Sequence, residues 1–369
     1  VFKKLTFDRQ FYERKNFFKF YKIVKRCQPE YLTSLNNFQV KPTVSMENFQ
    51  LRLWSYVKSL KMFSYKSLNK IDVARKCLKS MPNLNHLEIA HIEMENGFTH
   101  LLSDPERIEH LKLHITSKVL KNALHILQNL TKIKTLNLFI VHYIKIGDIL
   151  EAIRKLELCE VLILDLSLSS PVNSIPIRRL SSLTRLHTLM ISQPEIAHAL
   201  DIVELGSTIA ELKSLKVLDI APTASASKLE EFFRGESKNL DSLEEVRLKF
   251  LLEEHLQFKD SLEDWFKPKQ KLISLKLVFF LRNKFILSSD QLTKISQGIS
   301  VLKNLKYLNI NVLKSQASQD DTSVECLANL LKCLPQLREV ALMFPWHLLT
   351  DQEFRNFLLE IKSHRCLTL

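Results

Sequence analysis

Apolar residues recur along this chain in one short pattern, in which a leucine-like residue is followed three and five positions later by two more. The clearest copy, LKNLKYLNI, carries the pattern at Leu305, Leu308 and Ile310. Thirteen copies have their first positions between 2 and 337, which is about 28 residues per copy. Alternate residues of a strand share a face, so each copy predicts a short strand whose second and third apolar residues point inward.

The regular copies follow one another along most of the chain. Their inward pairs are Leu87 and Ile89, Leu111 and Leu113, Leu136 and Leu138, Leu162 and Leu164, Leu189 and Ile191, Leu218 and Ile220, Val246 and Leu248, Leu275 and Leu277, Leu308 and Ile310, and Val340 and Leu342. Most segments between them have the periodicity of amphipathic helices, most clearly residues 291–303, 324–334 and 352–361.

One strand and one helix in about 28 residues resembles the longer, ribonuclease-inhibitor-like type of leucine-rich repeat. The resemblance covers essentially the whole chain, and it implies the α/β class. The expected architecture is a leucine-rich-repeat solenoid, with a curved parallel β-sheet on the concave side and helices on the convex side. We therefore expect residues 1–369 to form a single array of about 13 repeats. The chain departs from the family where Asn or Cys usually follows the strand, for example at Ile92, Thr116 and Pro194.

Five glycines occur in 369 residues, and no two of them are close in sequence. Phosphate-binding loops, dinucleotide fingerprints and nucleophile elbows all need clustered glycines. The sequence therefore indicates no enzyme and no cofactor.

The six cysteines show no CxxC spacing and no tight cluster, which favours reduced thiols inside the cell. The strongest apolar run, LVFFL at 277–281, is far shorter than the roughly 20 residues that cross a bilayer. We expect an intracellular, cytoplasmic protein without a membrane partner.

The net charge of +13 comes from the first part of the chain. Residues 1–80 hold 18 Lys or Arg against 5 Asp or Glu, whereas residues 81–369 are balanced. The basic patch comprises Lys3, Lys4, Lys15, Lys19, Lys22, Lys25 and Arg26. These side chains suit an acidic protein surface, which we favour over nucleic-acid phosphates, or they form a solvated face with no specific role.

Three groups of residues could carry chemistry, and each has a plainer interpretation. His86, His110 and His114 fall on concave positions of adjacent strands, but they lack a further ligand, so we expect surface histidines and no metal. Cys326 and Cys333 lie seven apart on one helix, where core packing is the expected role. A third set, in a charged connection, is expected to be a solvated loop: Glu253, Glu254, His255 and Asp260.

The concave positions of the central repeats include four apolar residues: Val161, Ile163, Met190 and Val217. Asp165, Thr188 and Asp219 interrupt them. Exposed apolar residues on adjacent strands, with a polar rim, are typical of a partner surface. The alternative is that another part of the parent protein covers the sheet.

These observations favour a non-enzymatic scaffold for protein–protein interaction, a structural subunit of a larger intracellular assembly. The Lys-, Asn- and Phe-rich composition is typical of AT-rich genomes and leads us to consider a location in the cytoskeleton or cilium. Two alternatives stay open. One is the substrate-recognition part of an F-box-type ubiquitin-ligase receptor, and the other is an RNA- or ribosome-associated basic repeat protein.

Overall fold

The computed structural model describes residues 4–6, 31–33, 57–65, 79, 81–92, 105–141, 146–167, 175–192, 201–221, 226–252, 261–281, 289–313, 325–343 and 351–363. They belong to two compact units, Val1–Ser169 and Ser170–Leu369. The prediction of one continuous array over residues 1–369 therefore stays a prediction.

The described part of the first unit contains seven parallel strands, which pair in the order of the chain. The strands are β1 (Lys4–Thr6), β2 (Tyr31–Thr33), β3 (Ser59–Tyr65), β4 (His86–Ile92), β5 (His110–Ile115), β6 (Thr135–Val141) and β7 (Val161–Ser167). Between them lie the 3-10 helices η5 (Pro105–Arg107) and η6 (Ser117–Val119), and the α-helices α4 (Leu120–Gln128) and α5 (Ile146–Ile153).

The second unit repeats this arrangement with six parallel strands in its described residues. The strands are β8 (Thr188–Ser192), β9 (Val217–Ile220), β10 (Glu245–Leu252), β11 (Ser274–Leu281), β12 (Tyr307–Leu313) and β13 (Glu339–Met343). The α-helices are α6 (Ile202–Glu211), α7 (Ala226–Arg234), α8 (Ser261–Phe266), α9 (Ser289–Ser300), α10 (Glu325–Cys333) and α11 (Asp351–Ser363), and the 3-10 helices are η7 (Ile177–Ser182) and η8 (Glu236–Asn239).

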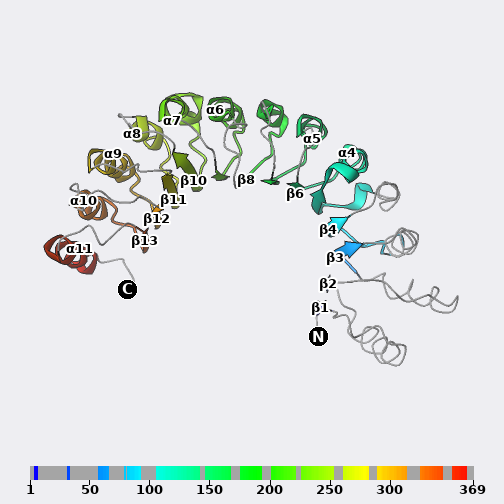
Figure 1. Cartoon of the computed structure of the whole chain (residues 1–369), viewed down its shortest axis with the longest axis horizontal. Coiled ribbons are helices and arrows are strands. Elements are labelled where there is room, and N and C mark those ends of the chain that lie inside the picture. Colours follow the sequence, from blue (N-terminus) through cyan, green and yellow to red (C-terminus); the bar gives the residue numbers. More distant parts are fainter. Residues whose placement is uncertain are drawn as a thin grey trace. The chain divides into compact units, whose positions relative to one another are not determined.

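Strands and helices of the second unit form two layers, with β8–β13 on the inner side of its arc and α6–α11 on the outer side (Figure 1). The predicted α/β class and leucine-rich-repeat architecture are thereby confirmed. The three helices expected from periodicity also form, as α9, α10 and α11. We call the sheet face that points away from the helices the open face; it corresponds to the predicted concave face.

The inward residues of the repeat pattern make the core. Every predicted pair from Leu87 and Ile89 to Leu308 and Ile310 is at most 3% exposed. Burial of such a side chain stabilises the fold by about 1.5–3 kcal/mol, so the stacked leucines hold each unit together. Val340 and Leu342 are only half-buried, since β13 is the last strand of the described sheet.

The backbone also links many of the strands to the preceding repeat in the same way. The amides of Lys134 and Thr135 both donate to the carbonyl of Glu109, at 2.7 and 2.9 Å. In the second unit, the amides of Lys306 and Tyr307 both donate to the carbonyl of Ile273, at 2.8 and 3.0 Å. This shared acceptor fixes the register of each new strand as it enters the sheet.

An aromatic cluster fills the space between the helices and the sheet of the second unit. Its members are fully buried and come from α7, α8, β10 and β11: Phe232, Phe233, Phe250, Trp265, Phe266 and Phe279. Phe233 meets Trp265 edge-on at 5.4 Å between ring centroids, and Phe250 stacks on Phe279 at 5.6 Å. Such pairs add about 0.5–1.5 kcal/mol each to the burial of the rings.

Lys269 is buried against this cluster with no exposed surface. Its Nζ lies 3.9 Å from the centroid of the Trp265 ring, and it donates to the carbonyls of Trp265 at 2.7 Å and Ser237 at 3.3 Å. The hydroxyl of Ser237 accepts from Trp265 Nε1 at 3.0 Å and donates to the carbonyl of Phe232 at 2.6 Å. Burial lowers the pKa of Lys269 to about 7, while the charge of Asp241 acts in the opposite direction.

Candidate functional site

Two of the predicted partner residues, Val161 and Ile163, lie on β7 of the first unit. Both are on the open face and half-buried, and they pair in register with Thr135 and Asn137 of β6. Two residues further along, burial raises the pKa of Asp165. This open face is therefore apolar only in part.

The other two predicted partner residues lie in the second unit, Met190 on β8 and Val217 on β9. Both are half-buried on the open face. Met190 pairs in register with Asp219, and Val217 with Thr188. The sheet thus brings Met190 and Val217 onto adjacent strands, as the repeat spacing predicts.

The predicted basic patch falls almost wholly outside the described residues. Lys3, Lys15, Lys19, Lys22, Lys25 and Arg26 lie outside them, and Lys4 belongs to β1. The predicted loop set, Glu253, Glu254, His255 and Asp260, also lies outside them. The roles assigned to these residues stay predictions.

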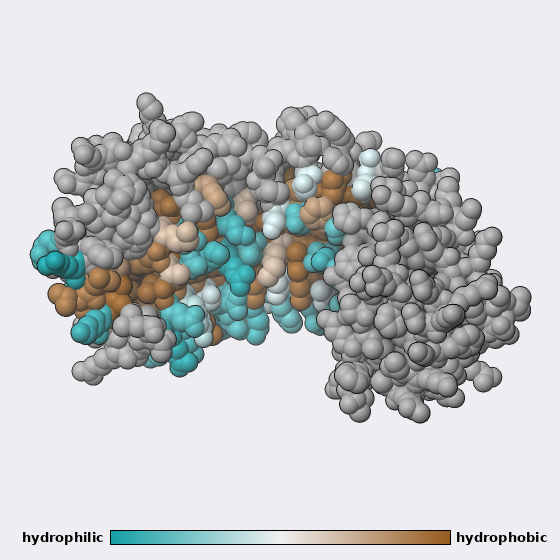
Figure 2. Space-filling model, turned by 60° about the horizontal axis from the view of Figure 1, so that its bottom comes forward, coloured by the Kyte–Doolittle hydropathy of each residue, from teal (hydrophilic) through white to brown (hydrophobic). Residues whose placement is uncertain are grey.

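Among the residues whose burial the structure describes, the most exposed large apolar side chains of the open face lie on β11, β12 and β13. Phe280 is 40% exposed, Tyr307 38% and Met343 53%, whereas Val278 beside them is 4% exposed. The register places Met343 in the row of Asn311 and Val278, two residues from the row of Phe280, whereas Tyr307 lies in the row of Ser274, on the other side of Lys276. We call Val278, Phe280 and Met343 the apolar patch. Figure 2 shows hydrophobic surface at this end of the second unit, beside a hydrophilic region.

The hydrophilic neighbour of the apolar patch is a charged cluster on β9, β10 and β11. The Asp219 carboxylate, with its side chain 12% exposed, lies 3.2 Å from Lys249 Nζ and 3.8 Å from Arg247 Nη1. Arg247 also lies 3.5 Å from the Glu245 carboxylate. In register with Arg247 is Lys276, for which the described residues provide no ion pair.

Two amides lie between the charged cluster and the edge strand β13. Asn309 pairs in register with Lys276 and with Ala341, and Asn311 with Val278 and Met343. The Oδ1 atoms of both amides are buried without a hydrogen-bond partner. An unpaired buried acceptor costs about 1–3 kcal/mol, so these two amides lower the stability of this part of the sheet.

The predicted histidines lie on the open face of the first unit. The rings of His86 and His110 lie 5.6 Å apart on β4 and β5, whereas His114 packs on Phe139 at 4.7 Å. Burial, and secondarily the charge of His110, lower the pKa of His86, while Glu88 acts in the opposite direction. Among the described residues no three His, Cys, Asp or Glu side chains could hold a metal ion.

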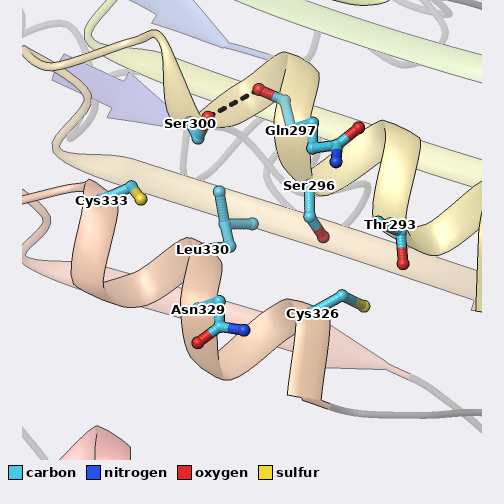
Figure 3. Close-up of a pocket in the computed structure, with 8 residues that line it drawn as sticks. All are labelled: Thr293, Ser296, Gln297, Ser300, Cys326, Asn329, Leu330 and Cys333. Carbon is cyan, nitrogen blue, oxygen red and sulfur yellow. Dashed lines mark hydrogen bonds between the residues drawn. The ribbon is translucent and has the colours of Figure 1, made fainter.

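Cys326 and Cys333 both face a groove between α9 and α10, which corrects the prediction that they pack in the core. The groove measures about 300 Å³, and both cysteines are only half-buried. Figure 3 shows both thiols on the α10 side, with Cys326 at the end of the groove near Thr293 and Ser296 of α9 and Cys333 at the end near Ser300. Burial raises the pKa of Cys326. The two positions share a helix face as predicted, but that face borders a groove.

Within the described residues, no helix is both long and apolar enough to cross a membrane. No protein-family profile and no curated protein sequence matches the chain. Among solved structures, the chain is similar to one from "Structure of the Toll - Spatzle complex, a molecular hub in Drosophila development and innate immunity". That match has a TM-score of 0.42 and 14% sequence identity, over 85% of this chain and 47% of that chain. This chain thus spans about half the length of its structural relative, and the fold assignment rests on the strands described above.

Proposed function

We propose that this chain is a non-enzymatic protein-interaction scaffold that binds its partner on the open face of the second unit. The observation that carries the proposal is the apolar patch, in which Phe280 and Met343 are each more than a third exposed; Tyr307, also more than a third exposed, lies further along the same face. Partly exposed aromatic and Met side chains beside a polar rim are the composition of protein interfaces. The charged cluster supplies that rim.

The predicted residues Met190 and Val217 would extend this surface across β8 and β9 of the same sheet. Val161 and Ile163 would offer a second, smaller contact on the first unit. We further propose that the basic patch of residues 1–80 meets an acidic protein surface, and that the repeats are of the ribonuclease-inhibitor-like type. The repeat length of about 28 residues with one helix supports that type.

We also propose that the chain works inside the cell as a subunit of a larger assembly. Cys159, Cys326 and Cys333 belong to no disulfide within the described residues, which is compatible with a reducing compartment.

Site-specific photo-crosslinking tests where a partner binds. A benzophenone amino acid replaces Phe280 or Tyr307 on the open face, and Gln297, exposed on α9, serves as the matched helix-side position. We expect positions 280 and 307 to crosslink to one and the same protein in the native cell, and that protein, once purified, to bind the chain. Crosslinks to that protein from position 297 alone, or crosslinks at 280 to unrelated proteins only, would refute the proposal.

A further inference from the structure

Three cations lie side by side on two neighbouring strands of the open face. Arg247 of β10 pairs in register with Lys276 of β11, and Lys249 lies two residues along β10 from Arg247. Like charges directly opposite each other on a sheet destabilise it. A bound anion would remove this repulsion between Arg247 and Lys276.

The carboxylates of the cluster compensate these cations incompletely. Asp219 interacts with both Arg247 and Lys249, and Glu245 interacts with Arg247. Two carboxylates therefore face three cations, and Lys276 has no carboxylate partner in the described part of the chain. Because Asp219 is nearly buried, it also holds the Arg247 and Lys249 side chains in place before any ligand arrives.

The apolar patch begins next to Lys276 on the same strand. Val278 follows two residues along β11 and Phe280 four, which in a strand corresponds to about 7 and 13 Å. Tyr307, in register with Ser274, lies on the other side of Lys276 and outside the apolar patch. A ligand that contacts both regions therefore needs its anionic and apolar groups about 7–13 Å apart, which is two to four residues of extended peptide.

We propose that the partner presents an extended peptide segment whose acidic side chain binds between Lys276 and Arg247. An aromatic or long aliphatic side chain, two to four residues away, packs on Phe280 and Met343. This inference rests on the proposed function and specifies the partner's chemistry.

Selection from a displayed library of random 12-residue peptides, with the purified chain as bait, tests the pattern without knowledge of the partner. We expect enrichment of Asp or Glu followed or preceded, at two to four residues, by Phe, Tyr, Trp, Leu or Met. The substitution Lys276→Glu should weaken a selected peptide at least tenfold, and a peptide with Lys in place of its acid should recover binding to that variant. Lys213→Glu, at an exposed lysine before β9, is the matched control and should leave affinity unchanged.

The outcomes separate this inference from the function on which it rests. The selected peptides could lose affinity for the Phe280→Asp variant, yet show no enrichment of Asp or Glu and bind the Lys276→Glu variant as well as wild type. That result would overturn the inference and leave the proposed binding surface standing. Failure to select any peptide sensitive to Phe280→Asp or Met343→Asp would count against both. A single-stranded RNA 20-mer could bind the chain more tightly than any selected peptide and lose affinity for the Lys276→Glu variant. That result would overturn the inference in favour of a phosphate ligand.

Discussion

The substitution Lys269→Met removes the one buried ammonium of the aromatic cluster and keeps a side chain of similar length. Lys269 has no exposed surface, contacts the Trp265 ring and donates to the carbonyls of Trp265 and Ser237. Two carbonyls and a ring face replace only part of the hydration that an ammonium loses on burial. The pKa of Lys269 is therefore lower in the folded chain than in the unfolded chain.

The magnitude follows from the two pKa values. Burial lowers the pKa of Lys269 from 10.5 to about 7, so between these values the unfolded state binds more protons than the folded state. The free energy of unfolding therefore rises with pH across that window, and the full penalty is present at and below pH 7. From pH 7 to pH 9 the rise amounts to about 2 kcal/mol by proton linkage.

Urea unfolding followed by circular dichroism at pH 7, 8 and 9 measures this slope. Wild type should gain about 2 kcal/mol relative to Lys269→Met over the two pH units. Lys271→Met, at an exposed lysine two residues away, should keep the wild-type slope. Parallel pH profiles for wild type and Lys269→Met would refute the assignment of a buried, destabilised charge to this position.

Three further predictions concern other positions. A Cβ at Gly298 would lie 2.9 Å from Leu262 Cβ, so Gly298→Val should lower the free energy of unfolding by about 1–3 kcal/mol in the same assay. Unchanged stability would contradict the close packing of α8 and α9. Burial raises the pKa of Cys159 to about 12, so native protein should resist iodoacetamide at this thiol at pH 8, and mass spectrometry should find it alkylated only after unfolding. NMR titration should give His86 a pKa below 6.5. In His110→Asn this pKa should rise, but stay below 6.5, because the charge of His110 is removed while the burial of His86 persists. An unchanged pKa in that variant would exclude coupling between the two rings.

The repeat pattern predicted the strands because it is a local property of the chain. Leu308 and Ile310, like their counterparts in other repeats, lie buried in parallel strands at the predicted positions. Strand alternation likewise assigned Val161 and Met190 to the open face. It did not predict how exposed they are, because exposure depends on neighbours contributed by other strands.

The apolar patch illustrates that limit. Val278 and Phe280 lie on the same face of one strand, yet they are 4% and 40% exposed. Applying the alternation rule to the LVFFL run and to LKYLNI would have marked Phe280 and Tyr307 as open-face residues, and that signal was present in the sequence. The burial of Lys269 had no such signal, since it depends on Trp265, Ser237 and the aromatic rings from two helices and two strands.

The most direct test of the proposed binding surface compares two exposed apolar residues that differ in location. Phe280, 40% exposed, lies on the open face, and Leu359, 64% exposed, lies on α11. With the purified partner identified by crosslinking, isothermal titration calorimetry should show that Phe280→Asp weakens binding about 30-fold or more, as expected for loss of about 2 kcal/mol at a central aromatic contact. Leu359→Asp should leave the affinity at the wild-type value. Equal affinities for wild type and Phe280→Asp, or a loss confined to Leu359→Asp, would contradict binding through the open face.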